Sequence, residues 1–159
     1  MRIAVVGVGE VGRGLIGGIS ELGRHEVLAC DPNPGKLTSS LVRQLGLELR
    51  PSAGEWMADA ELVFSCVEGR NALRVARSCF PYLRAGTEFV DLTTASPEDT
   101  RSAAGEAVAS GVVFNDMAIA GAISITRVRT PLIVAGAPGA RAQALFKALG
   151  TPLRVLAGA

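Results

Sequence analysis

The chain has 159 residues, of which 48% are hydrophobic and 19% charged, and its formal net charge is +1. This size and balance are typical of one soluble globular domain with a single core. Because acids and bases are mixed along the whole length and only 4% of the residues are aromatic, the composition argues against a nucleic-acid partner, and no apolar run approaches the roughly 20 residues that span a membrane.

The first half of the chain alternates apolar runs with helix-forming segments. Ile3–Val6 is apolar throughout, which indicates a central strand buried on both faces. The segment after it carries apolar residues on one helical face and ends at Gly23, a residue that favours helix termination. The chain then continues with a predicted strand Val27–Cys30, a helix Lys36–Leu45 and a short strand Leu47–Leu49.

The second half repeats this alternation. Ser96 is placed to cap a helix, with Pro97 in its first position and acids in its first turn. An α/β fold is therefore predicted, with a doubly wound, mostly parallel sheet and helices on both faces. The other predicted strands are Leu62–Cys66, Thr87–Asp91, Val112–Phe114, Leu132–Ala135 and Leu153–Leu156, and the other helices are Ala72–Cys79 and Ala140–Leu149.

Cysteine usage and the N-terminus bear on the cellular compartment. Cys30, Cys66 and Cys79 form no close pair and leave an odd count, which favours buried reduced thiols over a disulfide framework or a zinc site. The apolar start of the chain is followed by glycines and lacks the long apolar region of a secretory signal. We expect a cytoplasmic protein whose residues 1–159 form one domain.

The clearest motif is Gly7-Val8-Gly9-Glu10-Val11-Gly12, which lies between the first predicted strand and the first helix. This is the spacing of the dinucleotide fingerprint of Rossmann-type folds. Gly7 permits the tight turn, Gly9 lets the backbone approach a pyrophosphate, and Gly12 lets the helix pack on the strand. Backbone N–H groups at the start of the helix then face the phosphates. We predict that these six residues bind a dinucleotide cofactor.

Asp31 ends the second predicted strand, at about the position where an acid binds the hydroxyls of the adenosine ribose. A carboxylate there repels a 2′-phosphate, and Pro32–Pro34 contains no arginine to bind one. NAD is therefore favoured over NADP, although Lys36 would be able to reach a phosphate. The alternative is that Asp31 only starts a turn with Pro32.

Two further segments carry a family resemblance. Asp91–Pro97, with the sequence Asp-Leu-Thr-Thr-Ala-Ser-Pro, is similar to the segment beside the nicotinamide in the β-hydroxyacid dehydrogenase family. Asn115–Gly121 is similar to the substrate-side segment of the same family. Together with the glycine turn, these segments resemble the N-terminal domain of that family, whose relatives include 6-phosphogluconate dehydrogenase and the imine reductases.

The resemblance implies further cofactor contacts at the ends of predicted strands, where open α/β sheets bind ligands. Cys66 and Val67 would lie over the cofactor, Asn71 would contact it nearby, and Thr94 would approach the nicotinamide ribose. The alternatives are that Thr94 only shapes a turn and that Asn71 caps a helix.

The substrate-side segment departs from the family pattern. The resemblance places the substrate near Ala120, Gly121 and Ala122, but the family has a serine where Ala120 stands. Alanine cannot hydrogen-bond a carboxylate through its side chain, so an ordinary 3-hydroxy acid does not follow from this segment. Ser124 offers a substitute hydroxyl. Nearby arginines would bind an anion there or serve only as solvated loop charges.

The family transfers hydride between NAD(P) and a small substrate, here a polar hydroxy acid, carbonyl or imine compound. Its second, helical domain supplies a catalytic lysine, whereas this sequence has no lysine after Lys147. We therefore expect no catalytic residue in this chain, and a partner in the form of a missing C-terminal domain or a homodimer. Two alternatives are a non-catalytic, NAD-responsive regulatory module and a Rossmann domain that binds S-adenosylmethionine.

Overall fold

The computed structural model describes residues 1–156, in which strands and helices alternate. The strands are β1 (Arg2–Val6), β2 (Glu26–Cys30), β3 (Leu49–Arg50), β4 (Leu62–Ser65), β5 (Glu88–Asp91), β6 (Val113–Ile119), β7 (Leu132–Ala135) and β8 (Leu153–Leu156). The α-helices are α1 (Glu10–Glu21), α2 (Lys36–Gln44), α3 (Ala72–Cys79), α4 (Pro97–Ala109), α5 (Ile123–Thr126) and α6 (Ala140–Leu149). The short 3-10 turns are η1 (Glu55–Met57), η2 (Gly69–Asn71), η3 (Phe80–Tyr82) and η4 (Arg127–Arg129).

The strands form one sheet in the order β3-β2-β1-β4-β5-β6-β7-β8. Strands β1 to β6 are parallel, β7 runs antiparallel to β6, and β8 is parallel to β7. The chain winds outward from β1 in one direction and from β4 in the other, so β1 and β4 flank the point where the strand order reverses. The predicted doubly wound, mostly parallel sheet is confirmed.

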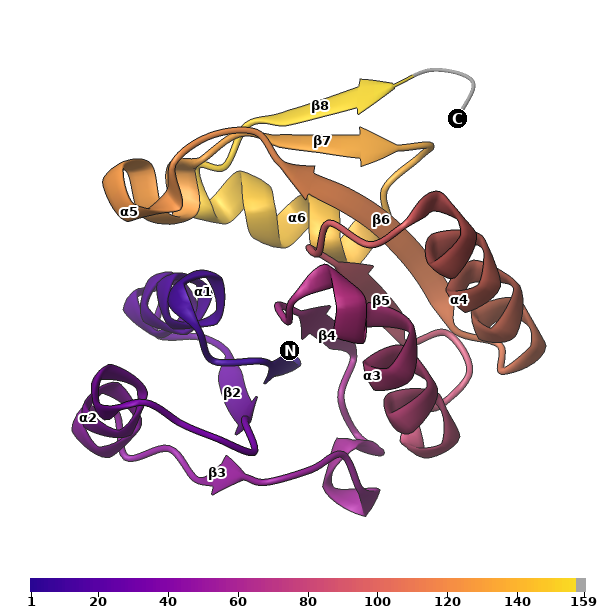
Figure 1. Cartoon of the computed structure of the whole chain (residues 1–159). Coiled ribbons are helices and arrows are strands. Elements are labelled where there is room, and N and C mark those ends of the chain that lie inside the picture. Colours follow the sequence, from indigo (N-terminus) through magenta and orange to yellow (C-terminus); the bar gives the residue numbers. More distant parts are fainter. Residues whose placement is uncertain (157–159) are drawn as a thin grey trace.

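Helices cover both faces of this sheet (Figure 1). On one face α1, α2 and α6 pack around an apolar core that includes Ile3, Ile16, Phe64 and Phe146. On the other face α3 and α4 pack around a second core that includes Phe89. Each central strand contributes alternate residues to the two cores, which explains why these strands are apolar throughout. Within residues 1–156, no helix is long and apolar enough to cross a membrane.

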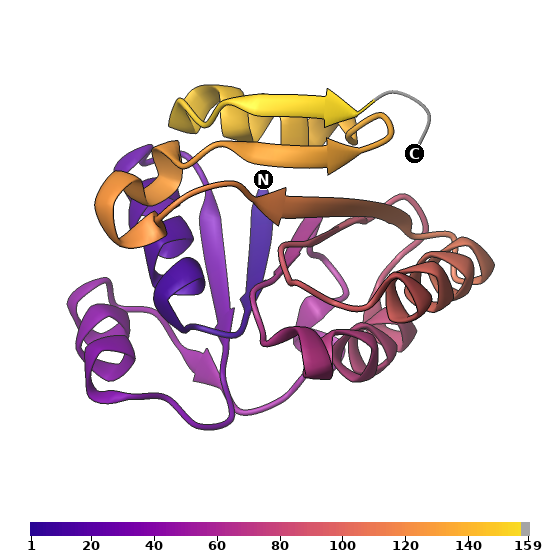
Figure 2. The same ribbon diagram turned by 45° about the horizontal axis from the view of Figure 1, so that its top comes forward.

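The structure differs from the predicted elements mainly after β5. Strand β6 continues to Ile119 because its last residues pair with β7, so the substrate-side segment is largely a strand. Figure 2 shows β6, β7 and β8 side by side. The short helix α5 follows β6 and was not predicted, and β3 begins at Leu49 rather than at Leu47. Ser96 caps α4 as predicted, since its Oγ accepts the Asp99 N–H at 3.1 Å.

Two polar side chains from the sheet bind the start of α6. Glu88 on β5 is only 4% exposed, and its carboxylate accepts the backbone N–H groups of Arg141 at 2.9 Å and Ala142 at 2.8 Å. Asn115 on β6 accepts the N–H of Gly139 at 2.6 Å. A Cβ atom at Gly139 would collide with the Glu88 carboxylate. The first N–H groups of α6 are therefore satisfied from neighbouring strands rather than by a residue of its own turn.

We predict that Glu88→Ala lowers the free energy of unfolding by about 3 kcal/mol, because it removes two charge-assisted hydrogen bonds and leaves buried N–H groups unpaired. Urea denaturation measures this loss. Arg141→Ala is the matched control, because it keeps the backbone N–H. It removes a half-exposed side chain that pairs with Glu88 at 3.7 Å and Glu61 at 3.9 Å and donates to the Gly86 carbonyl at 2.9 Å. Its effect should stay below about 1 kcal/mol. Equal losses in the two variants would show that the ion pair, and not the helix cap, is the stabilising contact.

Candidate functional site

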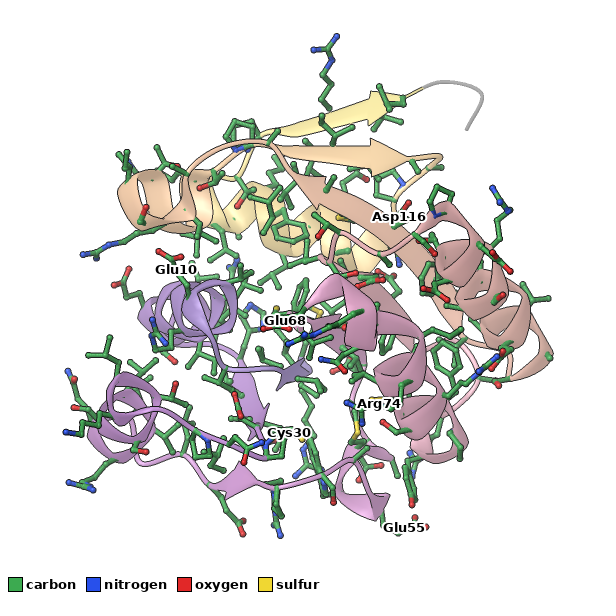
Figure 3. The ribbon with its side chains drawn as sticks, viewed as in Figure 1. Glu10, Cys30, Glu55, Glu68, Arg74 and Asp116 are labelled. Atoms are coloured by element: carbon green, nitrogen blue, oxygen red, sulfur yellow. The ribbon has the colours of Figure 1, made fainter. Side chains whose placement is uncertain are left out.

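A cavity of about 810 Å³ lies at the carboxyl ends of β1, β2 and β4. This is the switch point of the sheet, where open α/β folds bind ligands. Figure 3 labels Cys30, Glu68 and Arg74, which reach the cavity from β2, from the connection after β4 and from α3. Among the predicted site residues, the structure brings together in its wall Gly7, Gly9, Asp31, Cys66, Val67 and Asn71.

The three glycines of the turn are each required for a different reason. Gly7 has φ 86°, and a Cβ there would lie 2.9 Å from the Cys66 carbonyl group. A Cβ on Gly12 would collide with the carbonyl oxygen of Gly7. Gly9 is different, because among the described residues no atom outside its immediate neighbours lies within 4 Å of the position of its missing Cβ. The space in front of Gly9 therefore belongs to the cavity and not to the protein core.

The remaining residues of the turn do not face this cavity with their side chains. Val8 is fully buried in the core, and Val11 packs against the same core. Glu10 points to the other side of α1, where it lines a second cavity of about 840 Å³ between α1, α2 and α5 (Figure 3). Only backbone atoms of these residues are available to a ligand at the turn.

The start of α1 has no side-chain cap. Its N-cap residue is Gly9, and no side chain accepts a hydrogen bond from the first turn. The first N–H groups of a helix lack partners inside the helix and carry the positive end of the helix dipole. Next to a cavity, such a helix start is suited to bind a phosphate group.

Asp31 makes two hydrogen bonds to the backbone. Its carboxylate accepts the N–H of Val8 at 2.8 Å and that of Asn33 at 2.9 Å. The Asn33 contact closes a turn after β2, as the alternative interpretation of Asp31 expected. The half-buried carboxylate also lines the cavity. Lys36 is exposed and does not line the cavity.

Cys66 and Val67 follow β4 directly, and Asn71 precedes α3. The Asn71 side chain does not cap α3, because its Oδ1 atom accepts a hydrogen bond from Arg74 at 3.1 Å. Burial and the nearby Asp91 raise the pKa of the Cys66 thiol far above its usual range. Cys66 is therefore an apolar wall residue and not a thiolate nucleophile.

Thr94 lies on the loop after β5 and is exposed. It does not line the cavity, but its loop touches the loop that carries Asn71: a Cβ atom at Gly69 would collide with the Thr94 carbonyl oxygen. The structure thus places Thr94 beside the cavity rather than in its wall. Whether it contacts a cofactor remains a prediction.

Ala120, Gly121 and Ala122 lie exposed between β6 and α5. They do not line the 810 Å³ cavity and offer no polar side chain to a substrate. Ser124, the substitute hydroxyl considered above, lines the second cavity beyond α1, as do Arg127 and Arg129. Ser124 and the two arginines therefore face one cavity, and the six predicted residues in the wall of the 810 Å³ cavity face another.

Two contacts at the site have no signal in the sequence. Thr38 on α2 is 1% exposed, and its Oγ1 donates to the carbonyl of Val8 at 2.6 Å. Arg74 lines the cavity from α3, where it bonds to Asn71. Helical periodicity places Thr38 on the inner face of α2, but it does not show which backbone group the hydroxyl meets.

Asp91 is a buried acid next to the site. It ends β5, is 4% exposed, and accepts the N–H of Thr93 at 3.1 Å. Burial raises the pKa of its carboxyl from 3.8 to about 6. Asp116 is its register partner on β6 (labelled in Figure 3), and burial also raises the pKa of that carboxyl. The buried hydroxyls of Ser65, opposite Asp91 on β4, and of Thr93 have no hydrogen-bond partner within residues 1–156.

Residues of other catalytic types lie elsewhere. His25, the single histidine, lies in the turn before β2, where its Nδ1 is 3.3 Å from the N-terminal amine. Lys147 is exposed on α6. Within residues 1–156, no group of three or more His, Cys, Asp or Glu side chains is arranged to hold a metal ion.

The raised pKa of Asp91 predicts a pH-dependent stability. Because the folded-state pKa is about 6 and the ordinary value is 3.8, the folded protein binds more protons than the unfolded chain between these values. This contribution to stability is fully present below about pH 4 and is lost as the pH rises through 6, by about 3 kcal/mol.

Urea denaturation from pH 4 to 7 tests this expectation. The free energy of unfolding of the protein, relative to that of Asp91→Asn, should fall by about 2 kcal/mol over this range, since a small part of the loss has already occurred at pH 4. Glu55→Gln, which removes an exposed carboxylate on η1, is the control and should run parallel to the unmodified protein. A difference between the protein and Asp91→Asn that does not change with pH would assign the pH dependence to other groups.

Comparison with known proteins agrees with this geometry. A profile of the family described as the NAD binding domain of 6-phosphogluconate dehydrogenase matches residues 2–158. Among proteins of curated function, no relative matches the sequence of this chain.

Solved structures share the fold. A conserved hypothetical protein from Sinorhizobium meliloti is 25% identical, with a TM-score of 0.83 over 98% of this chain and 54% of its own. The 3-hydroxyisobutyrate dehydrogenase of Mycobacterium tuberculosis, solved with L-serine, is 23% identical, with a TM-score of 0.83 over 97% of this chain and 53% of its own. The imine reductase of Myxococcus stipitatus, solved with NADP+, is 21% identical, with a TM-score of 0.78 over 98% of this chain and 55% of its own. A variant of that reductase was solved with NAD+.

This chain spans about half the length of these solved proteins. The family profile, in contrast, covers almost all of it, and the resemblance found in the glycine turn and in Asp91–Pro97 is confirmed. The chain therefore belongs to the family of NAD-binding domains of 6-phosphogluconate dehydrogenase.

Proposed function

We propose that this chain is the cofactor-binding domain of an NAD(P)-dependent oxidoreductase that acts on a small polar hydroxy acid, carbonyl or imine compound. The observation that carries the proposal is the open space at Gly9, beside an uncapped helix start and inside a cavity of about 810 Å³. A side chain at this position would meet no atom of residues 1–156, so the space in front of the Gly9 backbone is open to a ligand.

The residues present fit a dinucleotide. The backbone N–H groups at the start of α1 would bind the pyrophosphate, and Asp31 would accept hydrogen bonds from the adenosine ribose. Cys66 and Val67 would form an apolar wall, with Asn71 at its end. When bound, the nicotinamide supplies hydride transfer, while the protein supplies binding and orientation. The Thr94 loop would lie at the nicotinamide end.

NAD is proposed over NADP because of charge. The Asp31 carboxylate lines the cavity at the end of β2, where it would repel a 2′-phosphate, and Lys36 does not reach the cavity wall. The arginines of the wall, Arg70, Arg74 and Arg77, come from η2 and α3 instead. One solved structure of the imine reductase contains NADP+, and the structure of its variant contains NAD+. The choice in this chain therefore depends on its own residues, chiefly Asp31.

Proton transfer and substrate binding are proposed to need a partner. The walls of the cavity contain no lysine or histidine among residues 1–156. We propose that a second, helical domain or a second copy of the chain supplies the acid–base group and completes the substrate site near Ala120, Gly121 and Ala122. Turnover of a small carbonyl compound by the whole protein would separate this proposal from a non-catalytic, NAD-responsive module, which binds the cofactor without turnover.

We predict that the chain binds NADH and that Gly9→Ala lowers the affinity by about tenfold or more, because the new methyl group occupies the phosphate position. Calorimetric titration measures both affinities. Gly17→Ala is the matched control, because Gly17 lies on the same helix and also has open space at its missing Cβ, but lines the other cavity.

Gly17→Ala should melt at or above the temperature of the unmodified protein, because alanine is the better helix former inside α1. Gly9→Ala should melt within about 4 °C of the unmodified protein, because alanine is a poorer N-cap residue than glycine by roughly 1 kcal/mol. Unchanged NADH binding by Gly9→Ala would show that the phosphates of the cofactor do not bind at the glycine turn. Failure of the unmodified chain to bind either NADH or NADPH would contradict the proposed function of the isolated chain.

We further predict that Asp31→Ala weakens the binding of NADH more than that of NADPH. The substitution removes the acceptor for the ribose hydroxyls, but it also removes the charge that repels a 2′-phosphate. The ratio of the two dissociation constants should shift by about tenfold towards NADPH. Equal losses for the two cofactors would show that Asp31 does not contact the ribose and acts only on the protein backbone.

A further inference from the structure

The peptide groups around Val8 are held from both sides. The N–H of Val8 donates to Asp31 at 2.8 Å, and its carbonyl accepts from the Thr38 hydroxyl at 2.6 Å. The Val8 side chain is fully buried. The first backbone hydrogen bond of α1 is accepted by the Gly9 carbonyl from Arg13, so the Val8 carbonyl lies outside the helix and depends on Thr38.

Thr38 is well placed to fix this carbonyl. It lies in the first turn of α2, is 1% exposed, and meets Val8 across 30 positions of sequence. A buried carbonyl that loses its only donor costs about 1 to 3 kcal/mol, so the turn would move to find another partner. Ser39, the next residue, is different, because its hydroxyl bonds only to the Gly35 carbonyl at the start of the same helix.

The position of Val8 determines that of Gly9. Gly9 has no side chain, and nothing in the protein occupies the space in front of it. Its backbone is therefore held by the peptide groups on either side, through α1 and through the contacts of Val8. A small rotation of the Val8–Gly9 segment would redirect the N–H groups that face the cavity.

We propose that Thr38 is a positioning residue for cofactor binding: with Asp31 it holds the Val8 peptide groups, and so keeps the glycine turn in the conformation that receives the phosphates. This inference rests on the proposed function and adds to it a residue on α2 that does not line the cavity. Preformed hydrogen-bond donors bind more tightly because less ordering is required on binding.

The test compares Thr38→Val with Thr38→Ser. Valine keeps the shape of threonine and removes the hydroxyl, whereas serine keeps the hydroxyl. Thr38→Val should weaken NADH binding by about tenfold, and Thr38→Ser should restore the affinity to within about threefold. Adenosine, which lacks the pyrophosphate, should bind both variants as it binds the unmodified chain, as measured by NMR titration.

Two controls separate positioning from a general loss of structure. Ser39→Ala removes the neighbouring hydroxyl and should change neither affinity. If Thr38→Val does not fold, Thr38→Ala takes its place, because it removes the hydroxyl without adding a methyl group against Val8. Unchanged NADH binding in the hydroxyl-free variant, or an equal loss for adenosine and NADH, would overturn the proposal.

A readout without cofactor keeps this inference distinct from the proposed function. Amide hydrogen exchange at Val8, whose N–H is bonded to Asp31, should be at least about tenfold faster in Thr38→Val than in Ser39→Ala. If exchange is faster in Thr38→Val but the unmodified chain binds no NADH, Thr38 does hold the turn, and it is the proposed function that fails. Unchanged exchange would contradict the positioning role even if NADH binds.

Discussion

Helix α1 lies against the end of β1 because no Cβ atom stands between Gly12 and the Gly7 carbonyl. The same restriction applies at Gly7, where a side chain would meet the Cys66 carbonyl at the end of β4. Three segments of backbone thus meet where the strand order reverses. This close approach brings the carboxyl ends of β1 and β4 and the start of α1 to one place, and the cavity forms around them.

The two helices α1 and α6 begin in opposite ways. At α6, Glu88 and Asn115 on neighbouring strands accept the first N–H groups, so the protein satisfies them internally. At α1, no side chain in the described part of the chain does so, and the N-cap residue of the helix, Gly9, lies beside a cavity. Unpaired helix starts that face open space are anion sites. The contrast within one fold supports an external partner for α1 and none for α6.

The fold was predictable because it follows local patterns. Apolar runs of strand length, helical periodicity and capping residues such as Ser96 depend on near neighbours in sequence, and the sheet order follows from the alternation of elements. The extension of β6 was missed because it depends on pairing with β7, which an apolar pattern in β6 alone does not reveal. The short helix α5 has no periodicity long enough to detect.

The candidate site was predictable only in part. The glycine turn has a fixed spacing, and the structure places it between β1 and α1, as its context in the sequence predicts; its binding of a dinucleotide stays a prediction. Glu88 and Thr38 carry no comparable signal, because each acts on a backbone group far away in sequence. Asp31 was predictable in its position but not in its contacts. The sequence places it at the end of β2, whereas its hydrogen bond with the Val8 N–H is apparent only from the structure.

The composition of α1 makes its helical structure dependent on the rest of the fold. Gly12, Gly14, Gly17 and Gly18 give this helix a low intrinsic propensity, since glycine costs about 1 kcal/mol relative to alanine in a helix. In contrast, α6 is rich in alanine and leucine and ends at Gly150 in the left-handed conformation. Helix α1 therefore depends more than α6 does on packing against the strands beneath it. The part of the molecule assigned to the cofactor is thus coupled to the formation of the sheet rather than to the stability of its own helix.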